Sequence, residues 1–231
     1  MKIVSHITQW LFVLVMPLLL ITASIGLAVN SQRLYEYGFE KYNISQTTGL
    51  AETELEKAAS GLIGYFNSGE DAISITVIKD GQPFTLFNER EVAHLRDVKG
   101  LIRLNYWILL GTGIYVLAYT GVNLSRRKNR SRLAWGLAGG GGITLGLILV
   151  LGLAAMMDFD YFFRQFHLIG FANDLWLLDP AKDYLIMLFP QGFWSDAATI
   201  IALVATGLAL LPAGMGAGYL LLARRQAKIK L

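Results

Sequence analysis

Residues 10–29 read WLFVLVMPLLLITASIGLAV and contain no charged side chain. A predominantly apolar run of about 20 residues is what an α-helix needs to cross the hydrocarbon core of a bilayer. Three further stretches are equally free of Asp, Glu, Lys and Arg: they lie between Arg103 and Arg126, between Arg132 and Asp158, and between Asp196 and Arg224. The sequence therefore predicts four transmembrane helices, at 10–29, 105–124, 133–157 and 197–223.

The composition agrees with this prediction. The 231 residues are 54% apolar and 16% charged, whereas soluble domains carry about 25% charged residues. The chain has no cysteine, which excludes disulfides, thiolate metal sites and a cysteine nucleophile. We therefore expect a membrane all-α fold in which 1–231 forms a single integral membrane domain.

A cleaved signal peptide is the alternative for the first segment, because Lys2 precedes the apolar run and small residues follow it. The apolar region of a signal peptide usually spans about 7–15 residues, which is shorter than the run seen here. Three later spans are also present for this segment to pack against. We therefore expect a retained transmembrane helix.

The charged residues are distributed unevenly around the four spans. Lys2, the loop 125–132 and the tail from Arg224 onwards hold ten basic residues and no acidic one. All seventeen acidic residues fall in 30–104 and 158–196. The positive-inside rule then places both termini and the loop 125–132 in the cytoplasm, and the two longer segments outside. Contact with lipid headgroups explains the basic clusters better than nucleic-acid binding.

The first outer segment, 30–104, reads as a small α+β extracytoplasmic cap. Thr53 and Glu56 fit a capping box that opens a helix ending near Asn67. The alternating residues 73–78, turn residues at 79–82 and a return at 84–87 predict a β-hairpin. Asn88 and Glu91 fit a second capping box, which opens a helix leading towards the second span.

The second outer segment, 158–196, holds eleven of the chain's 27 aromatic residues. An aromatic helical loop of this kind suits the headgroup region of a membrane. Asp160, Arg164 and His167 stand at i, i+4 and i+7, so a helix here carries one polar stripe. Asp179 and Pro180 predict the start of a short helix. An aromatic anchor and a binding pocket both remain open as interpretations.

Two of the three histidines, His94 and His167, fall in the outer segments. His94 and Asp97 are three residues apart and share a helix face, so the carboxylate can orient the imidazole. A fortuitous exposed pair is the alternative, which spacing alone favours. Neither segment contains HExxH, GxSxG, a P-loop or a dinucleotide fingerprint. The 73-residue separation of the two histidines does not favour zinc, and we expect no metal and no cofactor.

Several stretches of these outer segments resemble the Lit family, the lipoprotein intramolecular transacylases, also known as an uncharacterised integral membrane family. They read LFNEREVAHLRDVK at 86–99, FDYFFRQFH at 159–167, FANDLWLLDP at 171–180, KDYLI at 182–186 and FP at 189–190. The four-helix layout and the loop sizes agree over essentially the whole chain, while the membrane helices match only in hydrophobicity.

This resemblance implies an activity on bacterial lipoproteins. The family moves the sn-2 acyl chain of a diacylglyceryl cysteine onto the amine of the same cysteine, which leaves a lyso-form lipoprotein. The histidines thought to act in the family match His94 and His167. The expected supporting residues are Asp97, Lys99, Asp160, Arg164, Asn173 and Asp174, and the expected lipid-contacting residues are Phe163, Phe166, Phe171 and Trp176. We expect a monomer in the bacterial cytoplasmic membrane with its site at the outer leaflet.

The chemistry of such a transfer suits a histidine pair. An α-amine has a pKa of about 8, so a base must take its proton before it attacks an ester. Our hypothesis is that His94 is this base, oriented by Asp97, and that His167 is the partner acid or stabiliser; the reverse assignment stays open. Arg164, Asn173 or a backbone N–H are the candidate oxyanion donors. A covalent acyl-histidine or acyl-serine is the alternative mechanism, although no serine lies in a suitable motif.

Other classes of protein compete with this interpretation. A non-enzymatic sensor or assembly factor would use the cap to bind a protein and the aromatic loop only as an anchor. A transporter is disfavoured because the spans carry no charged residue to mark an ion path. A metal-dependent hydrolase is the third alternative.

Overall fold

The computed structural model of the chain describes residues 2–126 and 129–229. Arg127 and Lys128, in the basic loop predicted at 125–132, lie outside the described residues, as does the end of the basic tail. The chain forms two compact units. One consists of Met1–Ile25, Asn105–Leu153 and Ile201–Leu231, and the other of Gly26–Leu104 and Ala154–Ile200.

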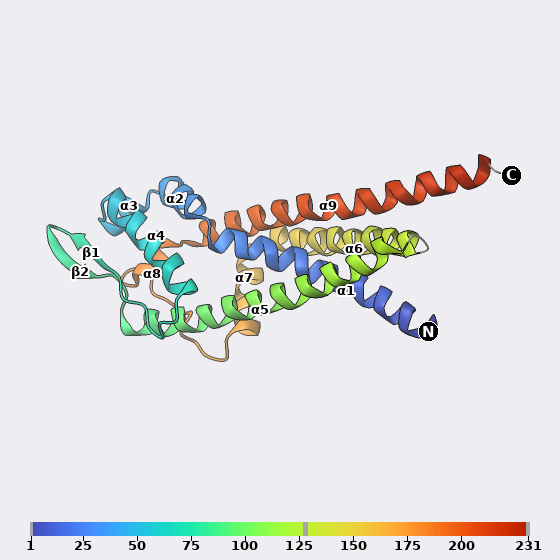
Figure 1. The fold of residues 1–231 in the computed structure, drawn as a ribbon. Helices are drawn as coiled ribbons and strands as arrows, with labels where there is room; N and C mark the ends of the chain where they lie inside the picture. The colour runs from blue at the N-terminus through green and yellow to red at the C-terminus, as the bar shows by residue number, and fades with distance from the viewer. Residues whose placement is uncertain (1, 127–128, 230–231) are drawn as a thin grey trace. The chain divides into compact units, whose positions relative to one another are not determined.

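Within the described residues, four helices are long and apolar enough to cross a membrane (Figure 1). They are α1 (Lys2–Val29), α5 (Glu89–Ser125), α6 (Arg130–Met157) and α9 (Gln191–Ile229). A mostly helical chain with four such helices and one small sheet was predicted, and this is confirmed. The 37 residues of α5 extend over about 55 Å, which exceeds a hydrocarbon core of about 30 Å. The charge-free stretch that suits a span begins only after Arg103, so the first part of α5 precedes the span.

The unit built from the long helices packs through small residues. Phe12 of α1 stacks on Tyr119 of α5 with ring centroids 4.4 Å apart. A Cβ added to Gly140 of α6 would lie 2.6 Å from Met16 of α1. A Cβ on Gly216 of α9 would lie 2.4 Å from a backbone oxygen of α6. Glycine at these positions is therefore what allows neighbouring helices to approach closely.

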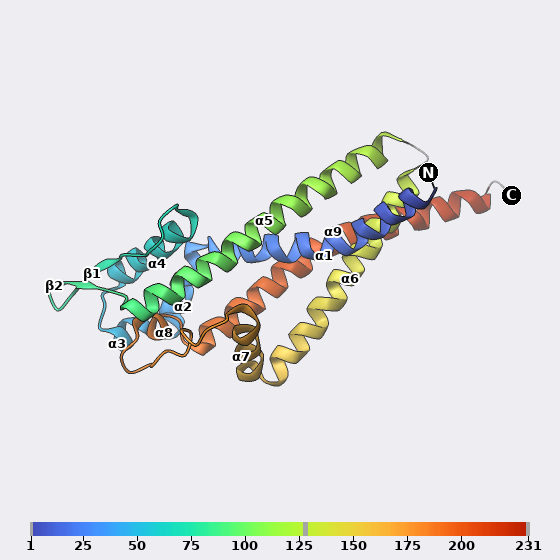
Figure 2. The same cartoon turned by 90° about the horizontal axis from the view of Figure 1, so that it is seen from below.

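The second unit surrounds the beginning of α5, where both views show α4, α8 and the hairpin (Figures 1 and 2). Its other elements are α2 (Gln32–Lys41), α3 (Ile44–Thr48), α4 (Glu52–Asn67), β1 (Thr76–Lys79), β2 (Gln82–Thr85), α7 (Phe159–Gly170) and α8 (Tyr184–Leu188). Its core contains fully buried apolar side chains from these elements and from the segments between them, among them Leu50, Leu62, Val77, Leu86 and Leu188. This core fixes the loops and helices that carry the site.

The hairpin was predicted from its alternation and turn residues, and the structure confirms it. Strands β1 and β2 are antiparallel, with Lys79 opposite Gln82. Asp80 and Gly81, which connect them, both have positive φ angles of 52° and 76°. Two consecutive positive φ angles match the right-handed twist of a tight hairpin, and Asp-Gly is well suited to adopt them.

The two predicted capping boxes had different outcomes. At the start of α5, Asn88 N–H donates to Glu91 at 2.7 Å, and Glu91 N–H donates to the Asn88 side chain at 3.1 Å. This is the reciprocal pair that defines a capping box. The box at Thr53 is wrong, because α4 begins at Glu52 and its N-cap, Ala51, makes no side-chain bond.

Candidate active site

The site is built on α5 and α7, both of which contribute residues to the same compact unit. His94 lies in the second turn of α5, and His167 lies in the last turn of α7. Both side chains are buried, at 6% and 7% exposure. Their ring centroids are 6.2 Å apart with an interplanar angle of 28°. The fold therefore brings together two histidines that are 73 residues apart in the sequence.

One ring nitrogen of His167 is held by its own helix. Nδ1 lies 2.8 Å from the carbonyl oxygen of Phe163, one turn earlier in α7. Because a carbonyl oxygen only accepts, Nδ1 carries the proton, and Nε2 of the neutral ring carries the lone pair. Burial lowers the pKa of His167, while the hydrogen bond to Phe163 acts in the opposite direction. The imidazole is thus fixed in one tautomer with Nε2 available as a base.

His94 has a different environment. Its Nδ1 is buried, and it has no hydrogen-bond partner among residues 2–126 and 129–229. The pKa of His94 is lowered from 6.5 to about 4, mainly by burial and in addition by the neighbouring His167, while Asp97 opposes the shift. His94 is therefore a neutral imidazole at pH 7.

Asp97 does not orient His94 as we expected. In the described part of the chain, no hydrogen bond joins the two side chains. Asp97 Oδ2 instead accepts a hydrogen bond from Asn173 Nδ2 at 2.9 Å, which connects α5 to the segment after α7. The carboxylate therefore acts on His94 only through its charge.

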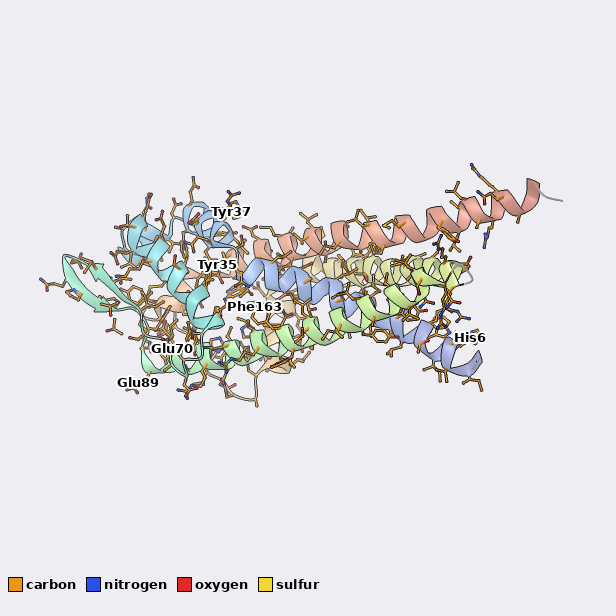
Figure 3. The ribbon with its side chains drawn as sticks, in the orientation of Figure 1. His6, Tyr35, Tyr37, Glu70, Glu89 and Phe163 are labelled. Carbon is orange, nitrogen blue, oxygen red and sulfur yellow. The ribbon has the colours of Figure 1, made fainter. Side chains whose placement is uncertain are left out.

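Aromatic rings enclose the two imidazoles. Four of them lie against His167, at centroid distances of 4.2 Å for Phe163, 5.3 Å for Phe166, 5.5 Å for Phe171 and 4.9 Å for Trp176. Phe171 also contacts His94 at 5.0 Å. Figure 3 labels Phe163 among the side chains of this region. The predicted lipid-contacting residues thus form an apolar wall around the histidines.

Three of the other predicted supporting residues lie together at the surface, beside the aromatic rings that contact His167. Asp160, Arg164 and Asp174 line a shallow hollow together with Phe163 and Trp176, so two rings that contact His167 also border this hollow. Asp160, Arg164 and Asp174 are exposed, and the polar stripe on α7 therefore has only His167 as a buried member.

Lys99 is not at the histidine pair. Its ammonium donates to Ser68 Oγ at 3.0 Å and to Glu70 O at 2.7 Å, and it lies 3.9 Å from the centre of the Tyr65 ring. Lys99 therefore fixes the segment between α4 and β1 to α5. The prediction that it supports the site directly is not matched by these contacts.

Sequence reasoning missed a buried carboxylate one turn before His94. Glu91 is 1% exposed and accepts the backbone N–H of Leu185 at 2.6 Å, in addition to closing the capping box. Asp183 is also buried; it accepts from the Asn88 side chain at 2.8 Å and from the Asp179 backbone N–H at 2.7 Å. These bonds fix the loop that carries Phe171 and Trp176 to the start of α5.

The predicted start of a helix at Asp179 is wrong, because the residues after Asp179 form one closed turn before the helix begins. Asp179 N–H donates to Asp183, and Asp183 N–H donates back to Asp179 O at 2.9 Å, which closes a single turn. The short helix α8 begins only afterwards, with Asp183 as its N-cap.

No group of three His, Cys, Asp or Glu side chains among the described residues could hold a metal ion. The arrangement offers two neutral imidazoles, a carboxylate–amide pair and an apolar wall. These groups can move protons beside a substrate that has both a polar centre and long hydrocarbon chains.

Residues 10–194 match the family described as lipoprotein intramolecular transacylase Lit, which is more than half of the chain. The chain belongs to the Lit family. It is 26% identical over 191 residues to an uncharacterised protein of Aquifex aeolicus, covering 79% of this chain and 82% of that protein.

Solved structures share the fold of this Lit-family chain. The membrane-integral Lit of Bacillus cereus matches with a TM-score of 0.82 at 21% identity, over 98% of this chain and all of that one. A variant of the same protein, in which one histidine is replaced by alanine, matches with a TM-score of 0.76 at 21% identity, over 97% of each chain. This chain and the Bacillus cereus Lit therefore share one helical fold.

Proposed function

We propose that this Lit-family chain is a lipoprotein intramolecular transacylase that acts on a diacylglyceryl cysteine. It transfers the sn-2 acyl chain from the glycerol oxygen to the α-amine of the same cysteine, giving lyso-form lipoprotein. The observation that carries this proposal is the buried pair of imidazoles, 6.2 Å apart, enclosed by aromatic rings. Membership of the family supports the transacylase class.

His167 is the base in this mechanism. Its Nδ1–H is engaged by the Phe163 carbonyl, so Nε2 is the nitrogen that accepts a proton, and the same bond stabilises the charged ring. His94 has no such stabilising bond and a pKa of about 4. Because His94 is the poorer proton acceptor, we assign the base to His167 and reverse our initial hypothesis.

The reaction forms one bond and breaks one. The amine nitrogen attacks the sn-2 carbonyl carbon and passes a proton to His167 Nε2. The tetrahedral intermediate then collapses, the C–O bond to glycerol breaks, and the glycerol oxygen takes the proton that His167 received. His94, a neutral imidazole, donates an N–H to the developing oxygen charge. Because amine and ester belong to one molecule, positioning removes much of the barrier.

The aromatic wall suits the lipid part of this substrate. Phe163, Phe171 and Trp176 present apolar faces beside His167, and acyl chains bury against such faces favourably. The first part of α5, which carries His94, precedes the charge-free span. His94 therefore lies outside the hydrocarbon core, in the headgroup region where the ester of the lipid substrate also lies.

The proposal includes an orientation in the bacterial cytoplasmic membrane. Both termini are cytoplasmic, the 30–104 cap and the 158–196 loop face outward, and the site lies at the outer leaflet. The ten basic residues of the predicted cytoplasmic segments support this orientation. A single chain, acting as a monomer, contains both histidines.

The test is mass spectrometry of a lipoprotein's N-terminal peptide from cells that lack other N-acylating enzymes. Wild type is expected to give an N-acyl, monoacylglyceryl cysteine, whereas His94→Ala and His167→Ala leave a diacylglyceryl cysteine with a free amine. His6→Ala is the matched control, since His6 lies in the first turns of α1 (Figure 3). A free amine in cells with well-expressed wild type would refute the proposal.

A further inference from the structure

We propose that Asp97 binds the α-ammonium group of the substrate cysteine and makes the site selective for a lipoprotein with a free amine. This inference rests on the proposed function and adds a recognition step to it. Asp97 is a positioning residue for the histidines' reaction: it holds the nitrogen that will attack, and it takes no part in bond making.

The carboxylate of Asp97 carries a charge that the described residues do not neutralise. Its one hydrogen bond comes from Asn173, a neutral amide, and no ion pair reaches it in the described part of the chain. The neighbouring cations of α5 make their hydrogen bonds to other groups. Arg96 donates to Asp71 O at 2.9 Å, Lys99 to Glu70 O at 2.7 Å and Arg103 to Ser68 O at 3.1 Å.

A second hydrogen bond of the Asn173 side chain identifies the atom that donates to Asp97. Its side-chain oxygen accepts the backbone N–H of Leu175 at 3.1 Å, so its Nδ2 is the atom that donates to Asp97 Oδ2. One carboxylate oxygen is thereby held in place. The other oxygen, Oδ1, has no hydrogen-bond partner within residues 2–126 and 129–229.

Both elements that hold Asp97 also hold the histidine pair. Asp97 lies three residues after His94 on α5, and residues at this spacing have Cβ atoms about 5–6 Å apart on one helix face. Asn173 lies two residues after Phe171, whose ring is 5.0 Å from that of His94 and 5.5 Å from that of His167. The carboxylate of Asp97 therefore lies close to the imidazole rings of His94 and His167.

An α-ammonium group is the ligand that fits this combination. A substrate amine with a pKa of about 8 is mostly protonated at pH 7, and a half-buried carboxylate binds the charged form by a charge-assisted hydrogen bond. Loss of one proton to water gives the neutral amine, and one of its two N–H groups then faces the imidazole that takes the second proton during attack. After transfer the nitrogen is an uncharged amide, and its attraction to Asp97 is lost, which favours release of the product.

The test uses lipopeptides that bind but cannot react, in which ether bonds replace both glycerol esters. One carries a free α-amine and the other an N-acetyl group, and each competes against turnover of an ester lipopeptide. Wild type is expected to bind the free-amine analogue at least tenfold more tightly, whereas Asp97→Asn is expected to bind both analogues within about threefold. A tenfold preference corresponds to a difference of about 1.4 kcal/mol in binding free energy.

Glu89→Gln is the matched control, since Glu89 is an exposed acid in the first turn of the same helix (Figure 3). It is expected to keep the preference of wild type. Asp97→Asn is expected to raise KM for the ester lipopeptide more than it lowers kcat, which a loss of stability alone would not produce. An unchanged preference for the free amine in a folded Asp97→Asn variant overturns the inference. Absence of turnover by wild type would instead count against the proposed function.

Discussion

Glu91 accepts the backbone N–H of Leu185 at 2.6 Å, although 94 residues separate them in the sequence. The other oxygen of Glu91 closes the capping box with the Asn88 N–H at 2.7 Å. A single buried carboxylate thus satisfies two backbone donors from two parts of the chain. It fixes the loop that covers the histidines to the helix that carries His94.

Glu91→Gln is expected to destabilise the protein, because the glutamine amide has a single oxygen and its nitrogen cannot accept the second of the two N–H donors. A buried donor without an acceptor costs about 1–3 kcal/mol. Thermal unfolding in detergent measures this as a lower Tm. Glu89→Gln, on the exposed first turn, is expected to change the Tm little. Equal Tm values for the two variants would show that the Glu91 bonds are not important for stability.

Gly216→Val is expected to disrupt the packing of α9 against α6. A Cβ at Gly216 would lie 2.4 Å from Ala134 O and 2.6 Å from Ala138 N, and backbone atoms cannot move aside as a side chain can. Gly218→Val is the matched control, because nothing lies within 4 Å of a Cβ there. Tm and the yield of folded protein after detergent extraction are the measurements. A normal Tm for Gly216→Val would show that this close approach is absent.

Stability is expected to fall as the pH decreases below neutral. Burial lowers the pKa of His94 to about 4 in the folded protein, whereas an unfolded histidine has a pKa of about 6.5. Between these values the unfolded chain binds more protons, so stability rises with pH in this window and is lost as the pH falls through it. Burial lowers the pKa of His167 as well, which acts in the same direction.

The measurement is the Tm at pH 7 and at pH 5 for wild type and for His94→Gln. The decrease in Tm between the two pH values is expected to be smaller in the variant, because glutamine does not titrate. Since other groups titrate in both proteins, the comparison between them isolates His94. A decrease of the same size in both would contradict the assignment of a buried, neutral His94.

The sequence was sufficient for elements whose signals are local. Charge-free runs predicted the four long helices, and the residues Asp80 and Gly81 predicted the hairpin turn, since only a few residue types adopt its backbone angles. The capping box at Asn88 was equally local. The box at Thr53 failed because α4 begins at Glu52 with Ala51 as its N-cap, so Thr53 lies inside the helix.

The site was less accessible to sequence reasoning. Spacing gives no reason to bring His94 and His167 together, and only the family resemblance singled them out as a pair. Glu91 was recognised as a capping residue, but such residues are normally at the surface, so its burial was not expected. Lys99 was expected to be a supporting residue of the site, whereas its ammonium donates to Ser68 Oγ and Glu70 O.

The central claim, transfer within one lipoprotein molecule that depends on His167, is tested most directly by a crossover experiment with purified protein. Two lipopeptides are mixed, one with an isotope label in its sn-2 acyl chain and the other with a label in its peptide. Mass spectrometry is expected to find each N-acyl chain only on its original peptide with wild type, and no N-acyl product with His167→Ala. Exchange of labels between the two peptides, or full transfer by a folded His167→Ala variant, would contradict the account.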